Sequence, residues 1–126
     1  HIVPELTVDQ LINRRAELLD SINRANATQY NDTIEHCKQS KADFGLNMER
    51  ERDKQVAEIN RKDGLSESER QRQVSETQAY FDREIKKHLL EIKRQISSAE
   101  VSLKRLDDHK AQLAKVETAL AKQLTH

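Results

Sequence analysis

The chain has very little of the residues that interrupt helices or fill compact cores. Its 126 residues include two glycines, one proline, one cysteine and no tryptophan, and only 3% of them are aromatic. A large globular domain buries most of its surface, which takes more apolar side chains than the 35% found here. Scarce Gly and Pro beside many charged residues are typical of long helices and coiled coils. We therefore expect long helices rather than a compact globular core.

Three further scarcities argue against whole classes of protein. The single cysteine, Cys37, cannot form a disulfide within the chain, and it favours a reducing, cytoplasmic compartment. No apolar run approaches the roughly 18 residues that a membrane span requires, and no signal peptide is recognisable. The 22 basic residues balance 22 acidic ones, so the basic excess of a nucleic-acid-binding protein is absent. We expect neither a membrane span nor a nucleic-acid partner.

Intrinsic disorder is the competing explanation for so hydrophilic a chain. Disorder combines low hydrophobicity with a high net charge. Here the charges cancel and the aliphatic residues recur at helical spacing, so folded helices are the better interpretation.

A first long helix is predicted over residues 7–62. Thr7 can cap its start, because Gln10 follows at the spacing of a capping box. Apolar residues then recur mostly at steps of three and four, the period of an α-helix. This stripe consists of Val8, Leu11, Leu18, Ile22, Tyr30, Ile34, Cys37, Phe44 and Met48, with Arg15 at an intervening position. Between Ile22 and Ile34 the steps predict a stutter, which locally relaxes a supercoil.

A second helix, predicted over residues 67–124, carries the more regular apolar stripe. Steps of three and four alternate along it almost without interruption, which is a strong coiled-coil signal. The stripe consists of Phe81, Ile85, Leu89, Ile92, Ile96, Ala99, Leu103, Leu106, Leu113, Leu120 and Leu124. Lys110 and Glu117 are the polar residues that fall on this face.

Residues 63–66 predict a tight turn between the two helices. Gly64 tolerates the left-handed conformation that closes a helix, and Ser66 with Glu69 forms a second capping box. The rival breakpoint is Gly45, which would convert the hairpin into a three-helix bundle. Because the stripe keeps its phase from Phe44 to Met48, we interpret Gly45 as a position within a continuous helix.

The resulting fold class is all-α: a single antiparallel coiled-coil hairpin over residues 1–126. Folding at the turn places Leu11 opposite Leu120 and Leu18 opposite Leu113, so that apolar residues meet. The residues predicted to form the seam are Leu11, Leu18, Ile22, Phe44, Ile85, Leu89, Ile92, Ile96, Leu103, Leu106, Leu113 and Leu120. The chain begins without an initiator methionine, which favours a fragment of a larger protein.

Further apolar residues flank this seam and widen it towards the broader face of a helical bundle. They are Ile12, Leu19, Leu90, Val101 and Val116. We expect a homodimer or homo-oligomer that forms a larger helical bundle, or a protein partner that supplies the missing helices.

One cluster resembles metal-binding chemistry. Glu84, His88 and Glu91 share a helix face, as in one limb of a carboxylate-histidine site in a bundle. The opposing stretch near Lys41 and Ala42 offers no second limb. No catalytic constellation and no phosphate-binding loop are recognisable either. We expect no enzymatic activity, no metal and no cofactor.

The function most consistent with these patterns is a structural or scaffolding module that mediates homo-oligomerisation and protein–protein interaction. The alternative is a hairpin of a secreted or surface-displayed microbial protein that binds a receptor or another partner. Two glycosylation sequons, at Asn26 and Asn31, would matter in that case. An oligomer in solution favours the first function, and a strict monomer favours the second.

Overall fold

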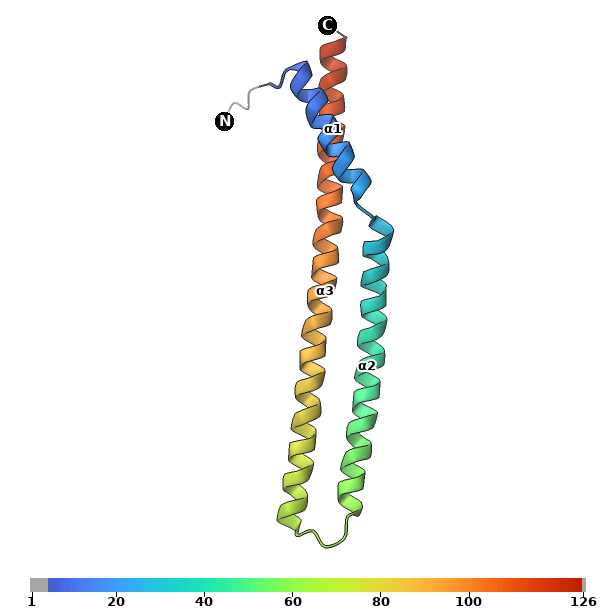
Figure 1. Cartoon of the computed structure of the whole chain (residues 1–126), viewed down its shortest axis with the longest axis vertical. Coiled ribbons are helices and arrows are strands. Elements are labelled where there is room, and N and C mark those ends of the chain that lie inside the picture. Colours follow the sequence, from blue (N-terminus) through green and yellow to red (C-terminus); the bar gives the residue numbers. More distant parts are fainter. Residues whose placement is uncertain (1–4, 126) are drawn as a thin grey trace. The chain divides into compact units, whose positions relative to one another are not determined.

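In the computed structural model (Figure 1), the described part of the chain forms three helices. They are α1 (Val8–Arg24), α2 (Ala27–Arg61) and α3 (Glu67–Leu124). The structure describes residues 5–125. Within that range every element is helical, so the predicted all-α class is confirmed.

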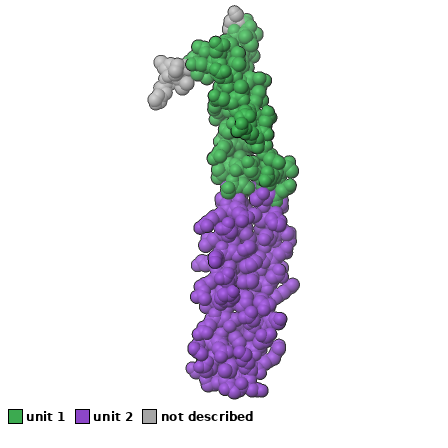
Figure 2. All heavy atoms as spheres, viewed as in Figure 1, with its two compact units in different colours: residues 1–32, 98–126 green, residues 33–97 purple. Residues whose placement is uncertain are grey.

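The helices belong to two compact units, which Figure 2 shows in green and purple. Unit 1 comprises His1–Asp32 and Ser98–His126, and unit 2 comprises Thr33–Ser97. In each unit the N-terminal limb packs antiparallel against a segment of α3, as the hairpin prediction requires.

The side-chain contacts show the antiparallel order directly. In unit 1 the Arg15 guanidinium lies 3.4 Å from the Glu117 carboxylate. In unit 2 the Cys37 thiol donates a hydrogen bond of 3.2 Å to Gln95. Further along α2, Arg52 pairs with Asp82 at 3.7 Å. Residue numbers on the two limbs of unit 2 thus run in opposite directions.

The predicted start of the first helix is confirmed by its cap. The backbone N–H of Gln10 donates to the Thr7 hydroxyl at 3.2 Å, and the Gln10 side chain accepts from the Thr7 N–H at 2.9 Å. Each side chain thereby satisfies one backbone donor that the first turn leaves without a helical partner.

The expectation of one continuous helix over residues 7–62 needs a correction. Ala25 has an extended backbone, with ψ at 142°, and Asn26 starts a new helix. The Asn26 side chain accepts a hydrogen bond of 3.0 Å from the backbone N–H of Gln29, which is the bond of an N-cap. The predicted stutter is therefore a full break between α1 and α2.

Gly45 lies inside α2, and the helix runs through it without interruption. The sequence-based preference for a continuous helix at this position is confirmed, and the alternative of a bundle broken at Gly45 is wrong. A helix can retain an interior glycine at a cost of about 1 kcal/mol relative to alanine.

The turn between α2 and α3 has the predicted left-handed glycine, with a φ of +81° at Gly64. Of the predicted capping box, the Ser66 hydroxyl accepts from the N–H of Glu69 at 3.1 Å, whereas the Glu69 carboxylate accepts from Arg72 at 2.7 Å. In addition, the Arg70 guanidinium donates to the carbonyls of Ile59 and Lys62 at 2.6 and 2.8 Å. Arg70 thus caps the C-terminal end of α2 from the first turns of α3, which the sequence alone gave no reason to expect.

Candidate interaction surfaces

The predicted seam residues fall into two classes of burial. Leu11, Leu18, Ile92 and Leu106 are buried. The other eight are partly buried, namely Ile22, Phe44, Ile85, Leu89, Ile96, Leu103, Leu113 and Leu120. Four more buried residues came from the same stripes or their continuation, namely Cys37, Ile59, Phe81 and Ala99. Each unit of the hairpin is thus held by a narrow line of buried side chains.

Val116 departs from its predicted place. It was expected at the flank of the seam, yet only 9% of it is exposed, and it forms a cluster with Leu11 and Leu18. Leu113, Ala119 and Leu120 pack against that cluster. The stripe of α3 therefore steps through Val116 and not through Glu117.

The polar residues that the sequence placed on the seam lie at its edge. Lys110 and Glu117 are exposed, whereas His109 is partly buried in the neighbouring position. Arg15 was the matching polar residue on the opposite limb, and it pairs with Glu117. Half of each of these two side chains remains in water. Such exposed pairs contribute little stability, so the seam of unit 1 rests on its aliphatic residues.

Several large apolar side chains remain in water. Of the predicted flanking residues, Ile12, Leu90 and Val101 are 51%, 54% and 55% exposed, while Leu19 is partly buried. Sequence reasoning missed the exposed residues Leu6, Leu46 and Tyr80. Leu46 and Leu90 each lie two positions from a seam residue, a spacing that points away from the seam.

Unit 1 has a groove beside its buried cluster. The groove measures about 800 Å³, and it lies beside the buried residues Leu11 and Val116. Its lining residues are Glu5, Leu6, Leu11, Lys115, Val116, Thr118, Ala119, Lys122 and Gln123. Gln123 donates to the carbonyl of Leu6 at 2.9 Å, which fixes the segment before α1 against α3. An apolar floor with charged margins suits the contact face of another helix.

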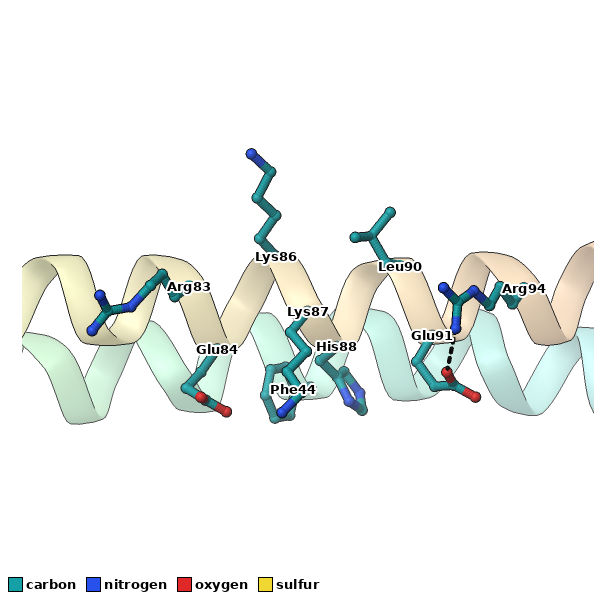
Figure 3. Close-up of a pocket in the computed structure, with 9 residues that line it drawn as sticks. All are labelled: Phe44, Arg83, Glu84, Lys86, Lys87, His88, Leu90, Glu91 and Arg94. Atoms are coloured by element: carbon teal, nitrogen blue, oxygen red, sulfur yellow. Dashed lines mark ion pairs between the residues drawn. The ribbon is translucent and has the colours of Figure 1, made fainter.

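Unit 2 has a groove around the contact between Phe44 and His88 (Figure 3). The two rings stack with centroids 3.7 Å apart and an angle of 29°. The groove measures about 730 Å³, and its lining residues are Phe44, Arg83, Glu84, Lys86, Lys87, His88, Leu90, Glu91 and Arg94. Phe44 was expected opposite Ile85. It instead stacks on His88, which lies about one helical turn after Ile85 on α3.

The residues that resembled a metal limb have other contacts. His88 stacks on Phe44, and the Nε2 atom of its imidazole is buried without a hydrogen-bond partner. Glu91 pairs with Arg94 at 3.7 Å. Among residues 5–125 no group of three or more His, Cys, Asp or Glu side chains could hold a metal ion.

One side chain shows a clear electrostatic effect. The hydrogen bond that Arg72 donates to Glu69 at 2.7 Å, together with the charges of Glu69 and Glu76, raises the pKa of Arg72 above its ordinary value. Since a guanidinium is already protonated at any physiological pH, this contact adds no titrating group. It strengthens a local ion pair on the first turns of α3.

Comparison with models of known protein families, with curated proteins and with solved structures found no match. No helix in the described part of the chain is long and apolar enough to cross a membrane. The functional argument therefore rests on the surfaces themselves.

Proposed function

We propose that this chain is a non-enzymatic scaffolding module that mediates homo-oligomerisation and protein–protein interaction. The observation that carries the proposal is the apolar surface of unit 1. There Ile12 on α1 and Val101 on α3 are each more than half exposed, and the exposed Leu6 lines a groove beside the buried residues Leu11 and Val116. A second copy of the chain that covers these side chains would extend the hairpin into a larger helical bundle.

The energetic reason is the apolar area that remains in water. Burial of a whole aliphatic side chain contributes roughly 1.5–3 kcal/mol, so covering the exposed half of one contributes about 1 kcal/mol. A few such side chains together offset part of the entropy lost when two chains associate. We place the module in the cytoplasm, where its single thiol, Cys37, stays reduced.

Sedimentation velocity over a range of protein concentrations tests the proposal. Leu6 lines the groove and Ile12 is exposed, so neither is needed to hold α1 in place. We expect Leu6→Asp together with Ile12→Asp to weaken self-association by about tenfold or more, because two apolar contacts become charged. Asn13→Asp together with Asn23→Asp is the matched control, since it adds two charges to α1 at exposed polar positions.

The helical content of each variant, measured by circular dichroism, separates a lost contact from a lost fold. A wild-type chain that sediments as a monomer up to millimolar concentration would contradict the proposal. Self-association that the paired substitutions leave unchanged would show that these apolar residues of unit 1 do not carry it.

A further inference from the structure

The outer face of α3 in unit 2 is strongly basic. We call it the cationic edge, and it consists of Arg83, Lys86, Lys87, Leu90, Lys93 and Arg94. Because a helix turns by about 100° per residue, Leu90 points nearly opposite to the buried seam residue Ile92. Figure 3 shows Leu90 and Lys86 directed away from α2.

The outer face of α2 in the same unit is largely acidic. We call it the acidic edge, and it consists of Asp43, Leu46, Glu49 and Asp53. Leu46 lies two positions after Phe44, so it too points away from the seam. It is 54% exposed, the same fraction as Leu90. Each edge therefore presents one exposed leucine among charges of predominantly one sign.

We propose that the acidic edge of one copy binds the cationic edge of a second copy, with the two helices antiparallel. This inference rests on the proposed function, because it specifies one surface through which the chain self-associates. The basis is charge complementarity within a chain that is neutral as a whole, with 22 basic and 22 acidic residues.

The register follows when Leu46 of one copy is placed on Leu90 of the other. In the antiparallel direction Asp53 then faces Arg83, Glu49 faces Lys86 and Asp43 faces Arg94. Glu49 lies three residues after Leu46 and Lys86 four residues before Leu90, while Asp43 lies three residues before Leu46 and Arg94 four after Leu90. Since a helix turns by about 100° per residue, a step of three on one helix and a step of four on its antiparallel partner bring residues to the same side. If the two helices were parallel instead, with Leu46 again placed on Leu90, Asp53 would lie beside Ser97 and could not contact Arg83.

One pair in this register opposes association. Arg50 borders the acidic edge and comes near Lys87 of the second copy. One like-charged pair against three opposite pairs and one leucine pair leaves the balance in favour of contact.

The charges on both edges are available for such contacts. Among residues 5–125, four basic residues of the cationic edge form no ion pair, namely Arg83, Lys86, Lys87 and Lys93. Arg94 pairs with Glu91 at 3.7 Å, and Asp53 pairs with Arg52 at 3.5 Å. The side chains of Arg94 and Asp53 nevertheless remain mostly exposed to water. Exposed pairs of this kind are weak, so they exchange readily for intermolecular ones.

The geometry makes the contact heterologous, because two different edges meet. Each copy then keeps one free cationic edge and one free acidic edge, so further copies can add. Salt screens exposed charges, and we therefore expect the mass in solution to fall as the ionic strength rises.

Charge reversal tests the pairing of the two edges. One variant carries Asp43→Lys, Glu49→Lys and Asp53→Lys, and the other carries Arg83→Glu, Lys86→Glu and Arg94→Glu. The first variant then has two basic edges and the second has two acidic edges. We expect each variant alone to self-associate about tenfold or more weakly than the wild type, since attraction becomes repulsion. An equimolar mixture should recover association.

The matched control for the acidic-edge variant is Glu100→Lys, Asp107→Lys and Asp108→Lys, which changes the net charge by the same amount at exposed positions of unit 1. It should sediment as the wild type does, and circular dichroism should show full helicity for all variants. If the wild type self-associates but the edge variants match it at low and high salt, the inference is wrong and the proposed function stands. If the wild type is a monomer throughout, both fail. If the cationic edge binds anionic vesicles or DNA and not the acidic edge, the inference alone is wrong.

Discussion

At the scale of single residues, the hairpin depends on few side chains. Leu18 is 1% exposed, and it forms the buried cluster of unit 1 with Leu11 and Val116. This cluster contains no charged or polar side chain, so it carries no cost for the burial of a polar group. Arg15 and Glu117 meet at the margin instead, where water still reaches both.

The assignment of Val116 to the core makes a prediction that separates it from its neighbour. We expect Val116→Ala to lower the free energy of unfolding by about 2 kcal/mol, since it removes buried methyl groups and leaves a cavity. Glu117→Ala removes an exposed ion pair and should change the stability by less than about 0.5 kcal/mol. Urea unfolding followed by circular dichroism measures both values.

The opposite order of effects would contradict the register of α3. If Glu117→Ala were the more damaging change, Glu117 and not Val116 would face α1. Glu117→Gln serves as a further control, because it keeps the length of the side chain while removing its charge.

The sequence identified most of the core for a simple physical reason. Leu11, Leu18, Ile92 and Leu106 lie on stripes whose helical period leaves one choice of buried face. Val116 was misplaced because a heptad alternates steps of three and four. A step of three after Leu113 reaches Val116, and a step of four reaches Glu117. Either step is compatible with a heptad, and only the packing against α1 selects Val116.

At the scale of elements, short polar signals define where each helix begins. Thr7 with Gln10 predicted the start of α1 correctly. Asn26, three residues before Gln29, carries the same kind of signal for the start of α2. Asn26 was interpreted as part of a glycosylation sequon inside one continuous helix, so its cap was not predicted. The break was therefore readable from the sequence, whereas the reach of Arg70 to the end of α2 was not.

The two glycines give a matched pair of predictions. Gly64 has a positive φ, so Gly64→Ala forces a side chain into the left-handed region and should destabilise the hairpin by about 1–2 kcal/mol. Gly45 lies within α2, and a Cβ there would meet no atom within 4 Å. Gly45→Ala should therefore stabilise the protein by about 0.5–1 kcal/mol.

Urea midpoints of the two variants and the wild type, compared at constant slope, test this pair. A Gly64→Ala variant as stable as the wild type would contradict the left-handed turn. A destabilising Gly45→Ala would contradict an unstrained helix at that position.

At the scale of the whole molecule, the surfaces are more informative than the balance of charge. A net charge of zero argued against the basic excess of a nucleic-acid-binding protein. Within unit 2 the signs are instead segregated, with basic residues on the outer face of α3 and mainly acidic ones on that of α2. Composition cannot show this, because the helical period decides which charges share a face.

Self-association is the central claim, and the mass of the chain in solution tests it most directly. Light scattering coupled to gel filtration gives that mass over a series of loading concentrations. We predict a mass above the 14.6 kDa of one chain, which falls towards that value on dilution. A mass of 14.6 kDa at every concentration, with full helicity, would contradict the account and favour a hairpin that binds a different protein.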